Sequence, residues 1–433
     1  MVAGGLVGLL GGGFRALLRL ADHLRSTLIV QAHVSPVYGA CATLLAVGAA
    51  AAAARWMVVR FAPIAAGSGV QHVEAMMRGE TTPAGAIVIP VKFVAGLLAI
   101  GSGLALGREG PTVQMGAAIG TVLSRTVLAK DPERTVVDAA AAGAGLAVAF
   151  NAPLGGSIFV FEELTRSFTP RLVIATVGAA AVAVAVMRLM LGDSQEFSAG
   201  TQAYQPIGQL PLYLGLGALL GLAGAGYNAL TLGLLSLADR LTAIPSIVRA
   251  AAIGIAVGAV GWFAPVLIGG GDTLAQGLMS ATTADIAMTS LVVIFLARLL
   301  LGPVCYAAGT PGGLFAPLLA LGAAFGLIYA RGLAVWLPGA PPPPVAFAVV
   351  GMAALFTAVV RAPLTGIVLT IEMTGRADLA LAMLFACLSS TLLATAIGSE
   401  PIYDSLRRRM LATMNGAGTS AVMQLLTVSQ RLD

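Results

Sequence analysis

The sequence predicts an all-helical protein that crosses a membrane several times and consists of two related halves. Three observations support this fold class: the overall composition, the long apolar segments and an internal repeat. Of the 433 residues, 58% are hydrophobic and 10% are charged, and the mean hydropathy is +0.93. Soluble proteins carry about 25% charged residues, so a soluble chain of this composition could not cover its surface with polar groups.

The apolar segments agree with this composition. Residues 37–54, 172–187 and 250–271 carry no charged side chain, and 377–398 carries only Asp378. A membrane-spanning helix needs about 20 apolar residues. Several segments are shorter than that or contain Gly and Pro, which predicts tilted, interrupted or re-entrant helices that pack among others.

An internal repeat divides the chain. The segment NAPLGGSIFVFEEL at 151–164 matches RAPLTGIVLTIEMT at 361–374, an offset of 210 that aligns Glu162 with Glu372. A second pair, 4–17 and 217–230, has an offset of 213. We expect a first transmembrane repeat at 1–190, a linker at 191–210, a second repeat at 211–410 and a short tail at 411–433. Such repeats are typical of transporters, which bind substrate where the halves meet.

Most of the 54 glycines are explained by close packing of membrane helices, but three Gly-rich segments differ from this pattern. They are GSGV at 67–70, GREGP at 107–111 and GTPGGLFAP at 309–317. Gly allows backbone amides to approach a ligand closely, and Pro fits the first turn of a helix. The segments therefore predict broken helices whose N-termini face a common point. Helix N-termini bind anions through partial positive charge and free N–H groups. Because such a site carries no full positive charge, it binds the anion weakly, as conduction requires.

Glu109 lies inside one of these segments. A carboxylate at membrane depth is costly and indicates function. We expect its carboxylate to occupy the anion site and to leave when protonated, so that Glu109 acts as a gate. The alternative is a structural ion pair between Glu109 and Arg108.

These residues resemble those of the CLC family of chloride channels and chloride/proton antiporters. The resemblance covers nearly the whole chain, and its motifs occur in the order and spacing of the family: GSG at 67–69, GREGP at 107–111, NAPLGG to FEE at 151–163, GGLFAP at 312–317, RAPLTG at 361–366 and PIY at 401–403. It implies an all-helical homodimer in which each subunit has one pore and two inverted-topology repeats with broken and re-entrant helices.

The resemblance also implies the chloride ligands. They are Ser68, Arg108, Glu109, Gly110, Leu314, Phe315 and Tyr403. Hydroxyl groups donate hydrogen bonds without net charge, and family members with Ser rather than Pro at the first position favour chloride over nitrate. The alternatives are that Ser68 only packs within its Gly cluster and that Tyr403 is an interfacial aromatic.

The acidic and basic residues receive roles by the same resemblance. Glu109 matches the external gate, and Glu163 matches the internal proton-transfer residue that antiporters retain. Glu162 matches a supporting acid, and Lys92 matches a lysine that raises the positive potential near the anion path. The repeat pairs Glu162, not Glu163, with Glu372, so Glu163 is an added feature. The alternatives are a surface acid for Glu163 and a helix-end lysine for Lys92.

The sequence departs from the family after the first motif. The family writes GSGIPE, whereas this chain has Val70, Gln71 and His72 after GSG. Loss of Pro removes a rigid helix start and restores an N–H group, and His72 replaces an acid with a side chain that can titrate near neutral pH. The tail after Arg409 is too short for the nucleotide-binding regulatory domains that some members carry.

We therefore expect secondary active exchange of chloride for protons. The alternatives are a passive chloride channel on the same fold and transport of another anion such as fluoride or nitrate. No Ser/His, HExxH or paired-Asp arrangement indicates an enzyme, the three cysteines lack metal-site spacing, and no cofactor or nucleic acid is expected. The apolar segments predict a multi-pass inner-membrane protein, and the basic run at 407–409 predicts that its C-terminus is cytoplasmic.

Overall fold

The computed structural model describes residues 1–433 except 128–132, 194, 201–206, 281–285, 337–342 and 415–433. The regular structure of this described part is helical, and its only β-type pairings are two isolated bridges. The predicted all-helical class is confirmed. The predicted tail at 411–433 lies outside the described residues beyond position 414.

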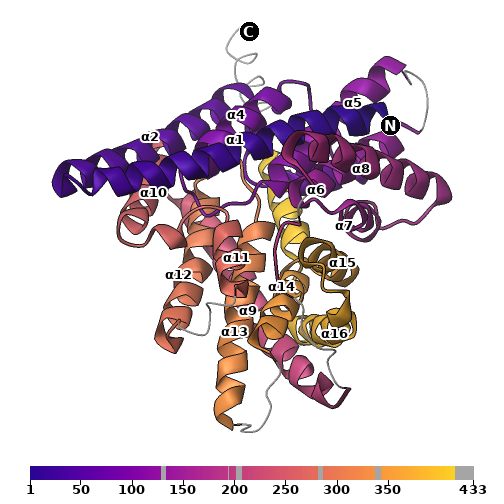
Figure 1. Ribbon diagram of the computed structural model, residues 1–433. Helices are drawn as coiled ribbons and strands as arrows, with labels where there is room; N and C mark the ends of the chain where they lie inside the picture. Colours follow the sequence, from indigo (N-terminus) through magenta and orange to yellow (C-terminus); the bar gives the residue numbers. More distant parts are fainter. Residues whose placement is uncertain (128–132, 194, 201–206, 281–285, 337–342, 415–433) are drawn as a thin grey trace.

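The helices follow one another in the same order in both halves, α1 to α8 and then α9 to α16 (Figure 1). The first half contains α1 (Val2–Ala32), α2 (Pro36–Phe61), α3 (Val70–Met77), α4 (Val88–Gly101), α5 (Glu109–Val127), α6 (Arg134–Phe150), α7 (Pro153–Phe159) and α8 (Pro170–Leu191). The second half contains α9 (Leu210–Arg240), α10 (Ser246–Phe263), α11 (Asp272–Met279), α12 (Met288–Ala307), α13 (Phe315–Trp336), α14 (Pro344–Val360), α15 (Pro363–Thr374) and α16 (Ala380–Ala396). A last helical segment covers 402–414.

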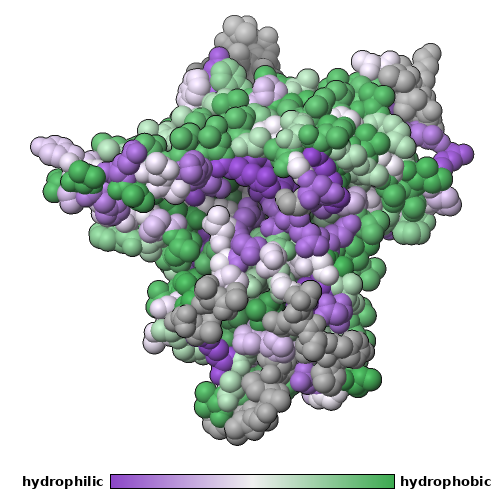
Figure 2. Space-filling model, viewed as in Figure 1, coloured by the Kyte–Doolittle hydropathy of each residue, from purple (hydrophilic) through white to green (hydrophobic). Residues whose placement is uncertain are grey.

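Eight of these helices are long and apolar enough to cross a membrane, and the chain is a multi-pass membrane protein. They are α1, α2, α8, α9, α10, α12, α13 and α16. The other apolar helices are shorter, as expected for interrupted and re-entrant segments. Figure 2 shows broad hydrophobic areas on the flanks of the molecule and hydrophilic residues gathered near the centre of one face.

Corresponding helices pack in the same way in each half. α1 packs on α8 as α9 packs on α16, and α5 packs on α6 as α13 packs on α14. A Cβ added at Gly4 would lie 2.4 Å from the Ala179 carbonyl oxygen, and one added at Gly217 would lie 2.1 Å from that of Ala386. The repeat at an offset of 213 therefore records small residues that allow close helix approach.

The centre of each half is a predominantly apolar, buried helix. Nearly every residue of α6 from Asp138 onward, and every residue of α14 from Val345 to Val360, is buried. A helix that is apolar all round belongs in the interior. α6 and α14 end at residues in the left-handed conformation, Asn151 (φ 56°) and Arg361 (φ 71°), after which a proline at the first turn starts α7 or α15.

The two halves cap each other's helices. The Glu162 carboxylate accepts hydrogen bonds from the α15 amides of Leu364 (3.0 Å) and Thr365 (2.7 Å). The Glu372 carboxylate accepts the equivalent bonds from Leu154 (3.1 Å) and Gly155 (2.7 Å) of α7. Each carboxylate satisfies free N–H groups at a helix N-terminus. This reciprocal contact explains why the repeat preserves these two acids, and it gives Glu162 a structural role.

Candidate functional site

Three interrupted helices begin close together at the junction of the halves. The segments before α3, α5 and α13 are joined by the two isolated bridges. The Gly67 amide donates to the Thr310 carbonyl (3.1 Å), and the amides of Gly107 and Gly313 each donate to the other's carbonyl (2.8 and 2.7 Å). These pairings place three helix N-termini around a common point, as predicted from the Gly-rich segments.

The loop before α3 needs glycine and a buried cation. Gly67 and Gly69 have φ values of 63° and 88°, a region that side chains disfavour. Lys92 of α4 is fully buried and donates through Nζ to the carbonyl oxygens of Ala65 (3.0 Å) and Gly67 (2.8 Å). Lys92 therefore holds the loop by binding its carbonyl groups, and its charge lies beside the GSG segment. This position is incompatible with a helix-end lysine that extends to solvent.

Glu109 begins α5, and its side chain reaches the start of α13. The carboxylate is fully buried, and Oε1 accepts a hydrogen bond from the Phe315 amide at 2.7 Å. Oε2 has no hydrogen-bonding partner among the described residues. The carboxylate thus binds at a helix N-terminus, where the free N–H groups of a helix favour an anion.

Two glycines make room for this carboxylate. A Cβ added at Gly107 would lie 2.0 Å from Oε2 of Glu109, and one added at Gly313 would lie 2.2 Å from Oε1. No real Cβ atom approaches an oxygen so closely. The Gly–Gly bridge between the segments before α5 and α13 is therefore also the wall of the site that the Glu109 side chain occupies.

Two buried hydroxyl groups lie beside this site. Ser68 Oγ and Tyr403 OH are inaccessible to solvent and lie near each other, and neither makes a well-formed hydrogen bond with a described residue. Ser68 Oγ would lie 2.4 Å from a Cβ at Gly110, and the Tyr403 ring lies 5.6 Å from the Phe315 ring, centroid to centroid. Buried hydroxyls are normally paired, so this pair fits a small hydrogen-bond acceptor held between α3, α5 and the segment at 402–414.

Arg108 points away from Glu109. Its guanidinium donates to the Ala149 carbonyl (2.9 Å) and to Glu196, and it lies 3.2 Å from Asp272. Its ion pairs are with Glu196 and Asp272, so the alternative of a structural Arg108–Glu109 ion pair is wrong. The structure does not bring the Arg108 guanidinium to the hydroxyl groups, whereas it brings Gly110 and Phe315 there. Leu314 is fully buried next to Phe315.

Glu163 lies in a π-helical turn, Val160–Leu164, and its side chain is 2% exposed. This burial excludes the surface-acid interpretation. Oε1 of Glu163 has no partner among the residues that the structure describes, and Oε2 lies 3.9 Å from Arg166. Arg166 also lies 3.6 Å from Glu74, a fully buried acid of α3. Sequence reasoning missed Glu74, although a carboxylate six residues after Ser68, within a membrane protein, is itself a signal.

The departure from the family motif has a structural consequence. Gln71 Oε1 accepts a hydrogen bond from the Gly69 amide (3.1 Å), and the Ser68 amide donates to Tyr306 OH (3.3 Å). His72 is buried, with 1% exposure. The Gln71 and Tyr306 side chains thus accept hydrogen bonds from two backbone amides of the GSG loop. The Ser68 hydroxyl nevertheless remains at the site.

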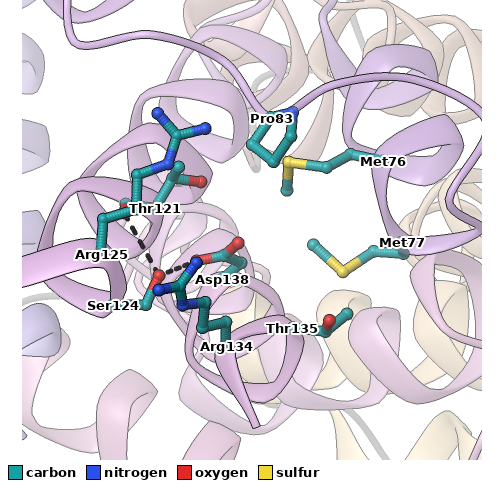
Figure 3. A pocket seen from close by; sticks show the side chains of 9 residues that line it. All are labelled: Met76, Met77, Pro83, Thr121, Ser124, Arg125, Arg134, Thr135 and Asp138. Atoms are coloured by element: carbon teal, nitrogen blue, oxygen red, sulfur yellow. Dashed lines mark hydrogen bonds between the residues drawn. The ribbon is translucent and has the colours of Figure 1, made fainter. Parts of the chain in front are cut away.

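A separate cavity of about 320 Å³ lies at the far end of α5 (Figure 3). It is lined by Met76, Met77, Pro83, Thr121, Ser124, Arg125, Arg134, Thr135 and Asp138. At a rise of about 1.5 Å per residue, Ser124 is roughly 22 Å along α5 from Glu109, so this cavity is not part of the site. No cluster of three or more His, Cys, Asp and Glu side chains suited to a metal occurs within the described residues.

Comparison with known proteins places this arrangement. Residues 49–395 match the family described as "Voltage gated chloride channel". The H(+)/Cl(−) exchange transporter ClcA of Vibrio parahaemolyticus is 38% identical over 365 residues, covering 82% of this chain and 77% of the relative. ClcA of Cronobacter sakazakii is 36% identical and covers 95% and 89%. The crystal structure of a slow cyanobacterial Cl−/H+ antiporter superposes with a TM-score of 0.91 at 34% identity, covering 96% and 97%.

Proposed function

Because the chain belongs to the voltage-gated chloride channel (CLC) family, we propose that it exchanges chloride for protons across a membrane. The observation that carries the proposal is the carboxylate of Glu109 on the Phe315 amide, with two unpaired buried hydroxyls beside it. A carboxylate and a chloride ion are both anionic hydrogen-bond acceptors. They can therefore occupy the same helix N-terminus in turn.

The chloride site consists of neutral donors. When the Glu109 carboxylate leaves, the Phe315 amide becomes available, and the hydroxyls of Ser68 and Tyr403 donate from the other side. The Lys92 ammonium contributes positive potential through the loop that it binds. Hydrogen-bond donors without a directly bound cation hold the ion weakly enough for release.

The proton is carried by two carboxylates. Protonation removes the charge that holds Glu109 at the start of α13, so the side chain leaves as a neutral acid and chloride enters. Glu163 supplies or receives this proton at its separate buried position beside Arg166 and Glu74. Because a passive channel needs no second buried acid, Glu163 favours exchange over channel function, and the Ser68 hydroxyl favours chloride over nitrate or fluoride.

The same proposal includes the assembly and orientation of the protein. We place it in the cell inner membrane as a homodimer, as the family resemblance implies. Its C-terminus is cytoplasmic in this proposal, because the basic residues at 407–409 follow the last apolar helix. Glu109 then opens to the outside, and Glu163 faces the cytoplasm. The two inverted repeats are 1–190 and 211–410, joined by the linker at 191–210.

A flux assay in liposomes tests the exchange. In the wild type, an outward chloride gradient should drive protons inward against their own gradient. Because the two fluxes are coupled in the wild type, its chloride efflux should stop when protons cannot move. Glu163→Gln should abolish proton movement while chloride still crosses, and Glu162→Gln is the matched control because its carboxylate caps α15. Chloride flux without proton movement in the wild type would refute exchange and leave the channel reading.

A further inference from the structure

The segment that joins the two halves carries a buried carboxylate that the exchange mechanism does not use. The Glu196 side chain is 6% exposed. Its neighbours are fixed: the Phe197 amide donates to the Met373 carbonyl of α15 (2.9 Å), and the Ser198 amide donates to Oε1 of Gln276 in α11 (2.8 Å). Glu196 is therefore held against elements of the second half.

Both oxygens of Glu196 accept hydrogen bonds from arginines of the first half. Oε2 accepts from Arg15 Nη2 (2.5 Å), and Oε1 accepts from Arg108 Nη2. The same guanidinium groups donate to carbonyl oxygens at the end of α6, Arg15 to Val148 (2.8 Å) and Arg108 to Ala149 (2.9 Å). One carboxylate and one helix C-terminus, which favours cations, thus set the position of both arginines.

This arrangement lies directly beside the gate, because Arg108 precedes Glu109 in the chain. We call Arg15, Arg108, Glu196 and Asp272 the Arg108 mouth. The other charged or titratable groups around Glu196, Arg108 and Glu109 are Arg19, Asp22 and Arg25 on α1, Tyr227 on α9 and Tyr403 at the site. Burial raises the pKa of Glu196, but the charges of Arg108 and Arg15 lower it to about 2, so Glu196 is ionised near neutral pH.

We propose that Glu196 is a positioning residue that compensates the charges of Arg15 and Arg108. It thereby lowers the affinity of the Arg108 mouth for anions and sets the pH at which the Glu109 gate opens. The inference rests on the proposed exchange function. With Glu196 ionised, the two arginines are compensated, and Arg108 is directed away from the anion site. Without that charge, an uncompensated cation stands next to Glu109. It stabilises the carboxylate in the closed position and attracts chloride at the mouth.

The test compares wild type with Glu196→Gln in liposomes. Chloride efflux is measured as a function of pH, and the KM for chloride is measured on the external side of the membrane, toward which the Arg108 mouth opens. The variant should reach half-maximal flux at a pH lower by roughly one unit, the lower end of the range for a nearby charge, because Glu196 acts through Arg108 and does not contact Glu109. Its KM for chloride should fall several-fold. Asp193→Asn is the matched control, because Asp193 lies in the same linker, is 75% exposed and pairs only with Arg188 among the described residues.

A charge cycle separates electrostatics from loss of structure. Arg15→Gln should shift the pH profile in the opposite direction, and Glu196→Gln combined with Arg15→Gln should return it toward wild type, whereas structural damage would add. An unchanged profile in Glu196→Gln, or a double variant further from wild type than either single one, would overturn the proposal. The proposed function predicts that chloride flux of the wild type depends on pH and that Glu109→Gln removes this dependence. If that control experiment fails, the proposed function is wrong, and the result does not bear on Glu196.

Discussion

Replacement of Gly107 by Ala should open the gate without removing its carboxylate. The added Cβ would lie 2.0 Å from Oε2, 2.4 Å from Oε1 and 2.5 Å from Cδ of Glu109, the three nearest atoms that it meets. All three belong to the end of a flexible side chain, so the carboxylate must move while the backbone need not. The displaced group loses its 2.7 Å hydrogen bond from the Phe315 amide.

The magnitude follows from that bond. A hydrogen bond to a charged group contributes about 1.5–3 kcal/mol, and about 1.4 kcal/mol corresponds to a tenfold change in an equilibrium. The ratio of open to closed gate should therefore rise roughly 10- to 100-fold at neutral pH. Chloride efflux from liposomes should be fast at neutral pH and nearly independent of pH, as for Glu109→Gln.

The control for this variant is Gly332→Ala in α13, because a Cβ there meets no atom within 4 Å. Both variants should purify as folded protein. If Gly107→Ala is folded and retains the slow, pH-dependent efflux of wild type at neutral pH, the carboxylate does not close the path from the position described here.

Three further predictions concern other parts of the structure. Glu162→Gln and Glu372→Gln should each lower the free energy of unfolding by about 1–3 kcal/mol, measured by thermal melting, because each change weakens a helix cap. The ratio of chloride to protons transported should stay unchanged, and an altered ratio would contradict a purely structural role. Although burial raises the pKa of Asp404, hydrogen bonds from Arg166 and a second arginine lower it below 3.8. That stabilisation is present above the unfolded pKa and is lost as the pH falls through the folded value, so the melting difference between wild type and Asp404→Asn should shrink below about pH 4; a constant difference would refute it. Tyr403→Phe should weaken chloride binding several-fold in calorimetric titration, and equal affinity would show that its hydroxyl is not a ligand.

The repeat and the outline of the site could be predicted from the sequence because they depend on local chemistry. The GREGP and GGLFAP segments start helices wherever the fold places them, and hydropathy excludes a soluble protein. The resemblance to the CLC family, not local chemistry, pointed to Phe315 as an anion ligand, and the structure places the Glu109 carboxylate on its amide.

Contacts between distant segments could not be predicted in this way. The alignment of Glu162 with Glu372 was visible, but the reciprocal caps exist only because α7 and α15 pack together. Glu74 meets Arg166, and Glu196 meets Arg15 and Arg108, across separations that no periodicity encodes.

One signal was present in the sequence but overlooked. FAPIAAGSG at 61–69 and FAPVLIGGG at 263–271 form a third repeated pair with an offset of 202. The structure shows its meaning, since Arg298 of α12 donates to the Leu267 (2.9 Å) and Gly269 (2.7 Å) carbonyls as Lys92 of α4 does to Ala65 and Gly67. A buried cation thus holds the corresponding loop in each half. A comparison of the short glycine segments would have revealed the repeat, but not the cations that bind it.

The central claim is that the Glu109 carboxylate occupies an anion site at the start of α13. Anomalous diffraction from crystals of Glu109→Gln grown in bromide tests it most directly. The account predicts a bromide ion at the position of the wild-type carboxylate, within hydrogen-bonding distance of the Phe315 amide and with the hydroxyls of Ser68 and Tyr403 on its other side. An empty Phe315 amide in a well-ordered crystal, with bromide bound elsewhere, would contradict it.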